Sequence, residues 1–150
     1  MTGYRSIVVG TDGSATAALA VRRAAQVAAD AGATLVIVSA YTPSTREEQV
    51  GAEEALGEEA FLVRGSTPAE ETLAVAADAA KQAGAREIRT QPVDGAPVDV
   101  LRKAVADHAA DLLVVGNRGL NTLSGRVLGS VPSHVARTAG CDVLIVHTSD

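Results

Sequence analysis

The chain has 150 residues, of which 47% are hydrophobic and 2% aromatic, and its formal net charge is −5. This length suits one domain that buries about two-thirds of its unfolded surface, so we expect no second domain. The acidic balance disfavours non-specific nucleic-acid binding, which needs a basic face, and the few aromatic rings leave little on which single-stranded bases would stack.

The cysteine content and the first residues bear on the compartment. The single cysteine, Cys141, excludes an internal disulfide framework and a zinc site made of four cysteines. The first apolar run, SIVVG, is too short for a signal-peptide core or a membrane span. We therefore expect a cytoplasmic protein with no membrane partner.

Five short runs indicate β-strands. Four of them are aliphatic without alternation, which is typical of strands covered on both faces: residues 6 to 10, 34 to 40, 111 to 116 and 142 to 147. The fifth, residues 87 to 93, is more polar and contains Pro92. Because proline lacks the N–H that a central strand would donate, we expect this run at an edge of the sheet.

Helical patterns with start and stop signals separate these runs. The first spans residues 17 to 31, where small apolar residues recur at helical spacing, and Gly32 follows as a stop. A second helix is expected to begin after Thr67, at Pro68, and to stop at Gly84. A third is expected to begin at Pro97, and a fourth to follow Ser130 as its N-cap, with Pro132 in the first turn.

Alternating strands and helices predict an α/β fold of one domain, with a parallel sheet and helices on both faces. Ligands of such sheets bind beyond the carboxyl ends of the strands, where the strand order reverses. Residues 42 to 66 fit no regular element and carry six glutamates between positions 47 and 59. We expect a mobile, solvated insertion there, with a lid or a short acidic helix as alternatives.

The loop after residues 111 to 116 holds the most specific motif. Gly116 and Gly119 follow the strand, and nine residues separate Gly119 from Gly129, which precedes Ser130 at a helix start. Unhindered backbone amides, a hydroxyl and a helix amino end are the components of an anion cradle. The alternative is a glycine-rich turn that ends in a capped helix. No lysine precedes Ser130, so the motif is not a Walker P-loop.

Charged residues beside both loops have two interpretations each. Arg118 and Arg126 would neutralise a phosphate, or would be solvated loop charges. Asp12, two residues beyond the first strand, would accept hydrogen bonds from a purine amino group or a ribose, or would hold the turn and help to start the next helix. Ser14 competes for that capping role.

Catalytic constellations are weak. His108, His134 and His147 are isolated, so a shared metal site is not expected, and Cys141 is interpreted as a packing residue. We identify no acid and base pair, which disfavours an enzyme. An ATP hydrolase or phosphotransferase with Mg²⁺ remains an alternative, as does a ligand-free dimer that acts through protein contacts.

Taken together, IVVGTDGS, PVDGAPVDVL and GNRGLNTLSGRVLGSVPSHVARTAGCDVLIVH resemble the universal stress proteins of the ATP-binding type. Their signature, G-x-x-G-x9-G-[ST], is met by Gly116, Gly119, Gly129 and Ser130. The resemblance implies a five-stranded parallel sheet of order 3-2-1-4-5. It also implies a homodimer joined through the last strand, whose first and last residues we expect to be Asp142 and His147.

The resemblance implies an adenine-nucleotide site as well. Its residues would be Gly10, Thr11, Asp12, Ala40, Val115, Gly116, Arg118, Gly119, Arg126, Gly129, Ser130 and Val131. The text GNRGLNTLSGRVLGSVPSHV resembles a subgroup that binds cyclic AMP as well as, or better than, ATP. If the acidic segment closes over the site it would repel extra phosphate charge, so we favour cyclic AMP, with ATP and its Mg²⁺ as the competitor. The expected role is a sensor or buffer of the nucleotide.

Overall fold

The computed structural model describes residues 3 to 41, 68 to 117 and 130 to 148, and for residues 130 to 132 it describes the backbone alone. In chain order the elements are β1 (Ser6–Gly10), α1 (Ala15–Ala31), β2 (Thr34–Tyr41), α4 (Pro68–Gln82), β3 (Glu87–Asp94), α5 (Pro97–Asp107), β4 (Leu112–Gly116), α6 (Ser130–Thr138) and β5 (Asp142–Val146). Each strand lies within one residue of its predicted bounds at either end. The insertion expected at residues 42 to 66 and the cap at Thr67 lie outside the described residues.

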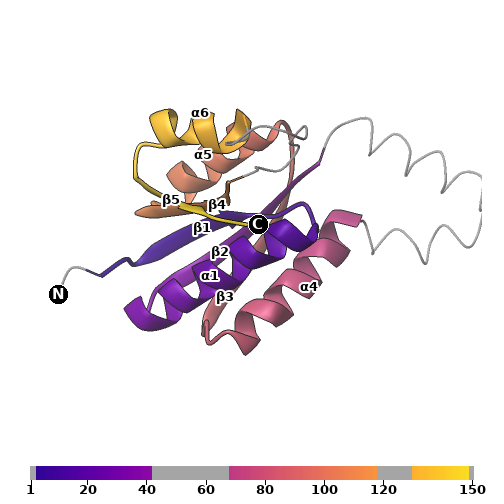
Figure 1. The fold of residues 1–150 in the computed structure, drawn as a ribbon, viewed down its shortest axis with the longest axis vertical. Helices are drawn as coiled ribbons and strands as arrows, with labels where there is room; N and C mark the ends of the chain where they lie inside the picture. Colours follow the sequence, from indigo (N-terminus) through magenta and orange to yellow (C-terminus); the bar gives the residue numbers. More distant parts are fainter. Residues whose placement is uncertain (1–2, 42–67, 118–129, 149–150) are drawn as a thin grey trace, which may run out of the picture.

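The strands form one parallel sheet of order β3-β2-β1-β4-β5, which confirms the predicted α/β fold and strand order (Figure 1). β1 occupies the centre, between β2 and β4. The chain runs outward from β1 through β2 to β3, and then returns to the other side of β1 for β4 and β5. The strand order therefore reverses between β1 and β4, where ligands of such sheets bind.

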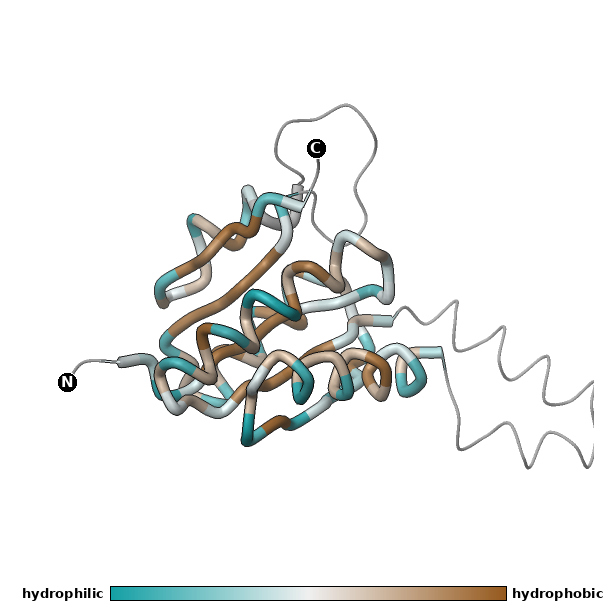
Figure 2. Tube along the Cα trace, turned by 60° about the horizontal axis from the view of Figure 1, so that its bottom comes forward, coloured by the Kyte–Doolittle hydropathy of each residue, from teal (hydrophilic) through white to brown (hydrophobic). Residues whose placement is uncertain are grey.

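Alternate residues of the central strands face two separate cores. Ile7 and Val9 of β1 pack with α1 and α4, whereas Val8 packs with α5 and α6. Figure 1 shows the two helix pairs on opposite faces of the sheet, and in Figure 2 the central strands are largely brown, that is, hydrophobic. Covering on both faces explains why these strands carry no polar alternation.

Local signals explain where the first helix begins and ends. The Ser14 hydroxyl accepts a hydrogen bond from the Ala17 N–H at 3.1 Å, so Ser14 is the N-cap of α1. Gly32 ends the helix with a φ of +69°, in the left-handed region that glycine tolerates best. Small residues on the buried face of α1 let the helix lie close to the sheet; they are Ala17, Ala20, Ala24, Ala25 and Ala28.

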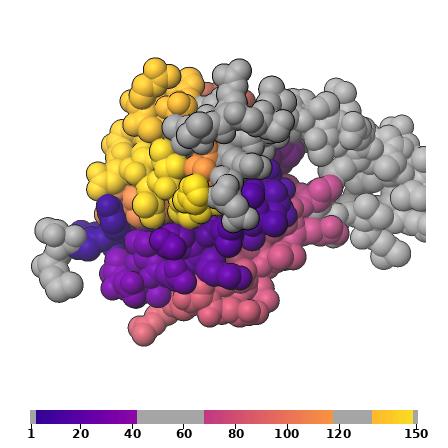
Figure 3. Space-filling model, viewed as in Figure 1, coloured from indigo at the N-terminus to yellow at the C-terminus, as the bar shows by residue number. Residues whose placement is uncertain are grey.

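The two edges of the sheet have different character. β3 forms one edge and contains Pro92, as the sequence predicts, beside the exposed Glu87 and Arg89. β5 forms the other edge, and its Val143, Leu144 and Ile145 are half-buried. Figure 3 shows the carboxyl-terminal residues (yellow) against α1 (purple), which in turn borders α4 (pink).

Among the described helices, none combines the length and the apolar character that a membrane span requires.

Candidate functional site

The sheet brings together the carboxyl ends of three strands that carry site residues predicted from the sequence. Gly10 ends β1, and Thr11 follows it with an N–H donated to Val38 O of β2 at 2.9 Å. Ala40 lies near the end of β2, and Val115 and Gly116 end β4. Because β1 lies between β2 and β4, all of these residues occupy one end of the sheet.

These residues differ in what they offer a ligand. Val115 is 3% exposed and packs in the core under α5 and α6, so only its backbone is available at the site. Gly10 and Thr11 are also buried. Ala40 is half-buried, and Asp12 is exposed. Asp12 is therefore the described site residue whose charged group reaches solvent.

Three side chains hold the turn between β1 and α1. Thr11 Oγ1 accepts from the Gly13 N–H at 3.1 Å, and Asp12 Oδ1 accepts from the Ser14 N–H at 2.9 Å. Ser14 then caps α1. The structural role considered for Asp12 is thus confirmed, with Ser14 rather than Asp12 as the cap. A contact between Asp12 and a ligand stays a prediction.

Gly13 is a residue of this turn that the sequence reasoning missed. Its φ is +84°, and a Cβ there would lie 3.0 Å from Thr72 Oγ1 of α4. Both the left-handed backbone and the close approach of α4 favour glycine. The run of TDGS after a buried strand was the available signal, because Asp-Gly pairs commonly mark turns.

Gly116 has a reason to be glycine that the sequence reasoning did not find. The sequence places it both at the end of the fourth strand and in the turn that leaves it; the structure makes it the last residue of β4, and its φ is not positive. A Cβ on Gly116 would lie 3.2 Å from Thr148 Cγ2 and 3.4 Å from Thr148 Oγ1. A side chain at position 116 would press against that of Thr148, which favours glycine there.

The amino end of α6 completes the described part of the site. In a parallel α/β fold the helix that connects two strands begins where the first strand ends, so α6 begins at the carboxyl end of the sheet. Ser130 and Val131 are its first two residues, and the buried Val135 anchors the helix to the core. Ser130 begins the helix instead of preceding it as predicted. Unpaired N–H groups of a first helical turn attract anions. Arg118, Gly119, Arg126 and Gly129 lie outside the described residues.

Side chains with catalytic potential do not gather in the described part of the chain. His108 is the C-cap of α5 and its Nε2 lies 3.0 Å from Gln91 Oε1, whereas His134 is exposed on α6 and His147 is exposed just beyond β5. No group of three or more His, Cys, Asp or Glu able to hold a metal occurs among the described residues. Burial raises the pKa of the Cys141 thiol, which supports its interpretation as a packing residue.

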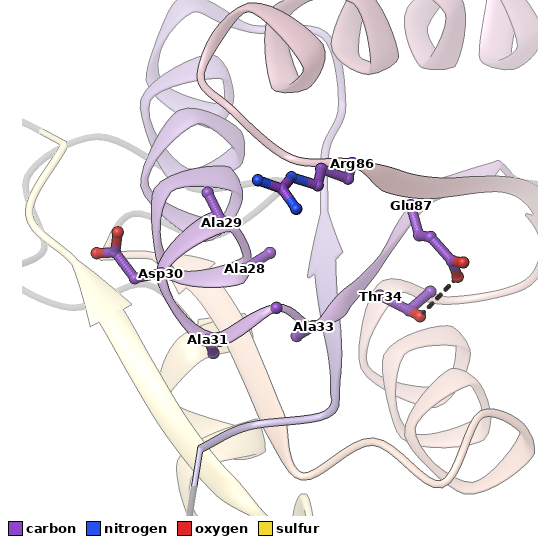
Figure 4. Close-up of a pocket in the computed structure, with 9 residues that line it drawn as sticks. Ala28, Ala29, Asp30, Ala31, Ala33, Thr34, Arg86 and Glu87 are labelled. Carbon is purple, nitrogen blue, oxygen red and sulfur yellow. Dashed lines mark hydrogen bonds between the residues drawn. The ribbon is translucent and has the colours of Figure 1, made fainter.

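Two hollows lie at the opposite end of the sheet from the strand ends considered above. One, of about 550 Å³, lies between the end of α1 and the start of β3, with Arg86 and Glu87 on one side (Figure 4). The Thr34 hydroxyl donates to Glu87 Oε2 there at 3.2 Å. The second, of about 520 Å³, lies beside Tyr4 and Val27. Neither hollow contains a residue that the sequence predicts for the site.

Comparisons with known proteins agree with this arrangement. A universal stress protein of Mycobacterium tuberculosis strain H37Rv is 49% identical over 149 residues, which are 99% of this chain and 100% of the relative. A putative universal stress protein of Staphylococcus aureus strain USA300 is 32% identical over 151 residues, covering 100% of this chain and 88% of the relative.

Solved structures and a family model complete the comparison. A crystal structure of a universal stress protein in complex with cAMP has a TM-score of 0.77 and 46% identity, and covers 99% of this chain and 100% of that one. The model of the universal stress protein family matches residues 3 to 147. The chain therefore belongs to the universal stress protein family.

Proposed function

We propose that this protein binds an adenine nucleotide, cyclic AMP in preference to ATP, at the carboxyl end of its sheet, and acts as a cytoplasmic sensor or buffer of that nucleotide. The observation that carries the proposal is the meeting of the ends of β2, β1 and β4 with the amino end of α6 at the strand-order reversal. The solved relative that holds cAMP supports the choice of ligand.

Each part of the site would contact a different part of the nucleotide. Thr11, Asp12 and Ala40 would line the adenine end, because they follow β1 and β2. The backbone of Val115 and Gly116, with Ser130 and Val131 at the start of α6, would surround the ribose and phosphate. Gly119 and Gly129 would supply further amides, and Arg118 and Arg126 would neutralise charge. Mg²⁺ would accompany ATP through its phosphates.

Calorimetric titration of the purified protein with cyclic AMP, ATP, AMP and GTP tests the proposal. We expect micromolar affinity for cyclic AMP, weaker binding of ATP in the presence of Mg²⁺, and still weaker binding of GTP. Gly119→Val should reduce the affinity at least ten-fold, because its side chain would occupy the approach of the phosphate. Lack of any adenine-nucleotide binding by the wild-type protein would rule the proposal out.

Two variants separate binding from other roles of the same loop. Gly125 lies between Gly119 and Gly129 but outside the signature, so Gly125→Ala should weaken binding less than Gly119→Val. The alternative function is an ATP hydrolase or phosphotransferase. It would be favoured if the protein turned over ATP faster than about once per minute and if Ser130→Ala abolished turnover but not binding.

We also propose that the protein forms a homodimer through β5. The β3 edge is protected by charged side chains and by Pro92, whereas β5 presents the aliphatic residues Val143, Leu144 and Ile145. An unprotected aliphatic edge tends to pair with another strand. Covering it with the same strand of a second copy would satisfy its backbone groups.

A further inference from the structure

Asn117 joins the end of β4 to the chain that leaves β5. Its N–H donates to Val146 O at 2.8 Å. Its side-chain Oδ1 accepts from both the N–H and the Oγ1 hydroxyl of Thr148, at 2.8 and 2.7 Å. We refer to the two hydrogen bonds between Asn117 and Thr148 as the Asn117–Thr148 link.

Burial of Thr148 protects the hydrogen bonds of the link from water. Thr148 is only 7% exposed, and its Cγ2 and Oγ1 lie over Gly116, where a Cβ would be 3.2 Å from the nearer atom. Water has little access to such a site, so it competes weakly for these hydrogen bonds. The backbone at residues 116 and 117 is therefore held from the β5 side by both contact and hydrogen bonding.

Asn117 also occupies a decisive position in the sequence. It lies directly after Gly116, the first glycine of the signature, and directly before the loop that leads to Ser130. An anion cradle made of backbone amides works only if those amides are already directed at the anion, because reorienting them on binding would cost affinity. The link holds the backbone of Gly116 and Asn117, the described residues with which the signature begins.

We propose that Asn117 is a positioning residue for the phosphate end of the nucleotide site, and that it acts through Thr148. This inference rests on the proposed nucleotide binding, and it assigns a ligand-directed role to Thr148, a residue outside the signature. The affinity that the phosphate contributes therefore depends on the Thr148 hydroxyl, which lies beyond the last strand. The adenine end, which follows β1 and β2, does not depend on it.

The test compares the affinities of cyclic AMP and adenosine for variants of Thr148. Thr148→Val keeps the shape of the side chain and the backbone N–H but removes the hydroxyl. We expect cyclic AMP to bind about three- to ten-fold more weakly, the range that loss of one hydrogen bond supports, while adenosine binds as before. Asn117→Ala removes the oxygen that accepts both hydrogen bonds from Thr148 and should have the larger effect on cyclic AMP.

Two control variants separate positioning from general loss of stability. Thr148→Ser keeps the hydroxyl but not Cγ2, and should bind cyclic AMP more tightly than Thr148→Val. Tyr4→Phe removes the 2.9 Å hydrogen bond from the Tyr4 hydroxyl to Asp142 Oδ2, at the opposite end of β5, and should leave both affinities unchanged. Unfolding by urea, measured for every variant, ensures that binding is compared among folded proteins.

The outcomes are distinct. If the wild-type protein binds no adenine nucleotide, the proposed function and this inference both fail. If it binds cyclic AMP and Thr148→Val binds it equally well, this inference alone is overturned. If Thr148→Val weakened the binding of adenosine and of cyclic AMP equally, the inference would also be overturned, because the variant would then disturb the whole site. Faster hydrogen exchange of the Asn117 amide in ligand-free Thr148→Val is the accompanying expected result.

Discussion

The turn after β1 is held by the side chains of residues that directly follow the strand. Thr11, Asp12 and Ser14 each accept one backbone N–H within a stretch of seven residues, Thr11 to Ala17. Such local hydrogen bonds fix the turn without help from a ligand. The charge of Asp12 is not required for the turn, because a neutral amide oxygen accepts the same hydrogen bond.

Asp12→Asn should therefore separate the two roles of this residue. The asparagine oxygen can still accept the Ser14 N–H, so we expect the free energy of unfolding to change by less than about 0.5 kcal/mol. If the carboxylate contacts the adenine or ribose, the affinity for cyclic AMP should fall at least three-fold. Urea unfolding and calorimetry measure the two quantities.

Ser14→Ala provides the matched control for that experiment. It removes the N-cap of α1 and should cost about 1 kcal/mol of stability with little effect on affinity. An Asp12→Asn protein that binds cyclic AMP as tightly as the wild type would limit Asp12 to its role in the turn.

At the scale of elements, the register of the hydrogen bonds determines which backbone groups face outward. In a parallel strand, the N–H and C=O of one residue point to the same side and successive residues alternate. Val146 O accepts from the Asn117 N–H, so the backbone N–H and C=O of Val146 point toward β4. By alternation, the backbone groups of Val143 and Ile145 point toward the open edge. On β3, Gly95 donates to Tyr41 O of β2, which by the same alternation directs Pro92 outward, where its missing N–H costs nothing.

Ile145→Pro should consequently dissociate the proposed dimer. It removes an outward N–H from β5 without removing one that β4 needs, and sedimentation should show a monomer where the wild type sediments as a dimer. Ile145→Ala keeps the N–H while reducing the side chain, and should remain dimeric. Thr90→Pro, at an outward position of the β3 edge, should also remain dimeric. A wild-type monomer at micromolar concentration would contradict the prediction.

At the scale of the whole molecule, the sheet depends on two cores built almost entirely from aliphatic side chains and alanine. Leu113 is fully buried on the α5 and α6 face, and Leu112 is buried on the α1 and α4 face. The close-packed surroundings relax only partly when a large side chain is removed, so a cavity is left. The strands that end at the candidate site are therefore packed on both faces.

Leu113→Ala should lower the free energy of unfolding by about 2 to 5 kcal/mol, since it leaves a cavity in the centre of one core. Val75→Ala is the control, because Val75 is 72% exposed on α4 and should change stability by less than about 0.5 kcal/mol. Urea unfolding of both variants measures the difference. Equal effects would contradict the assignment of the core.

Much of the fold follows from short stretches of sequence. Uninterrupted aliphatic runs such as residues 111 to 116 predict strands covered on both faces, and Pro92 predicts an edge, because both depend on local chemistry. The order of the five strands came from the family resemblance, because periodicity identifies elements but not their neighbours. The spacing of Gly116, Gly119, Gly129 and Ser130 predicts an anion cradle in the same local way.

The sequence by itself determined the elements, the layered α/β architecture and the motif at which to look for a ligand, because each is encoded within one stretch of chain. Only the tertiary structure decided what packs over Gly116 and which residue the Asn117 side chain bonds. Both depend on Thr148, which is 31 residues from Asn117 in the chain and lies against it only after β4 and β5 have paired. A contact of that kind leaves no periodic pattern in the sequence, because it is created by the pairing of two strands and not by either strand alone.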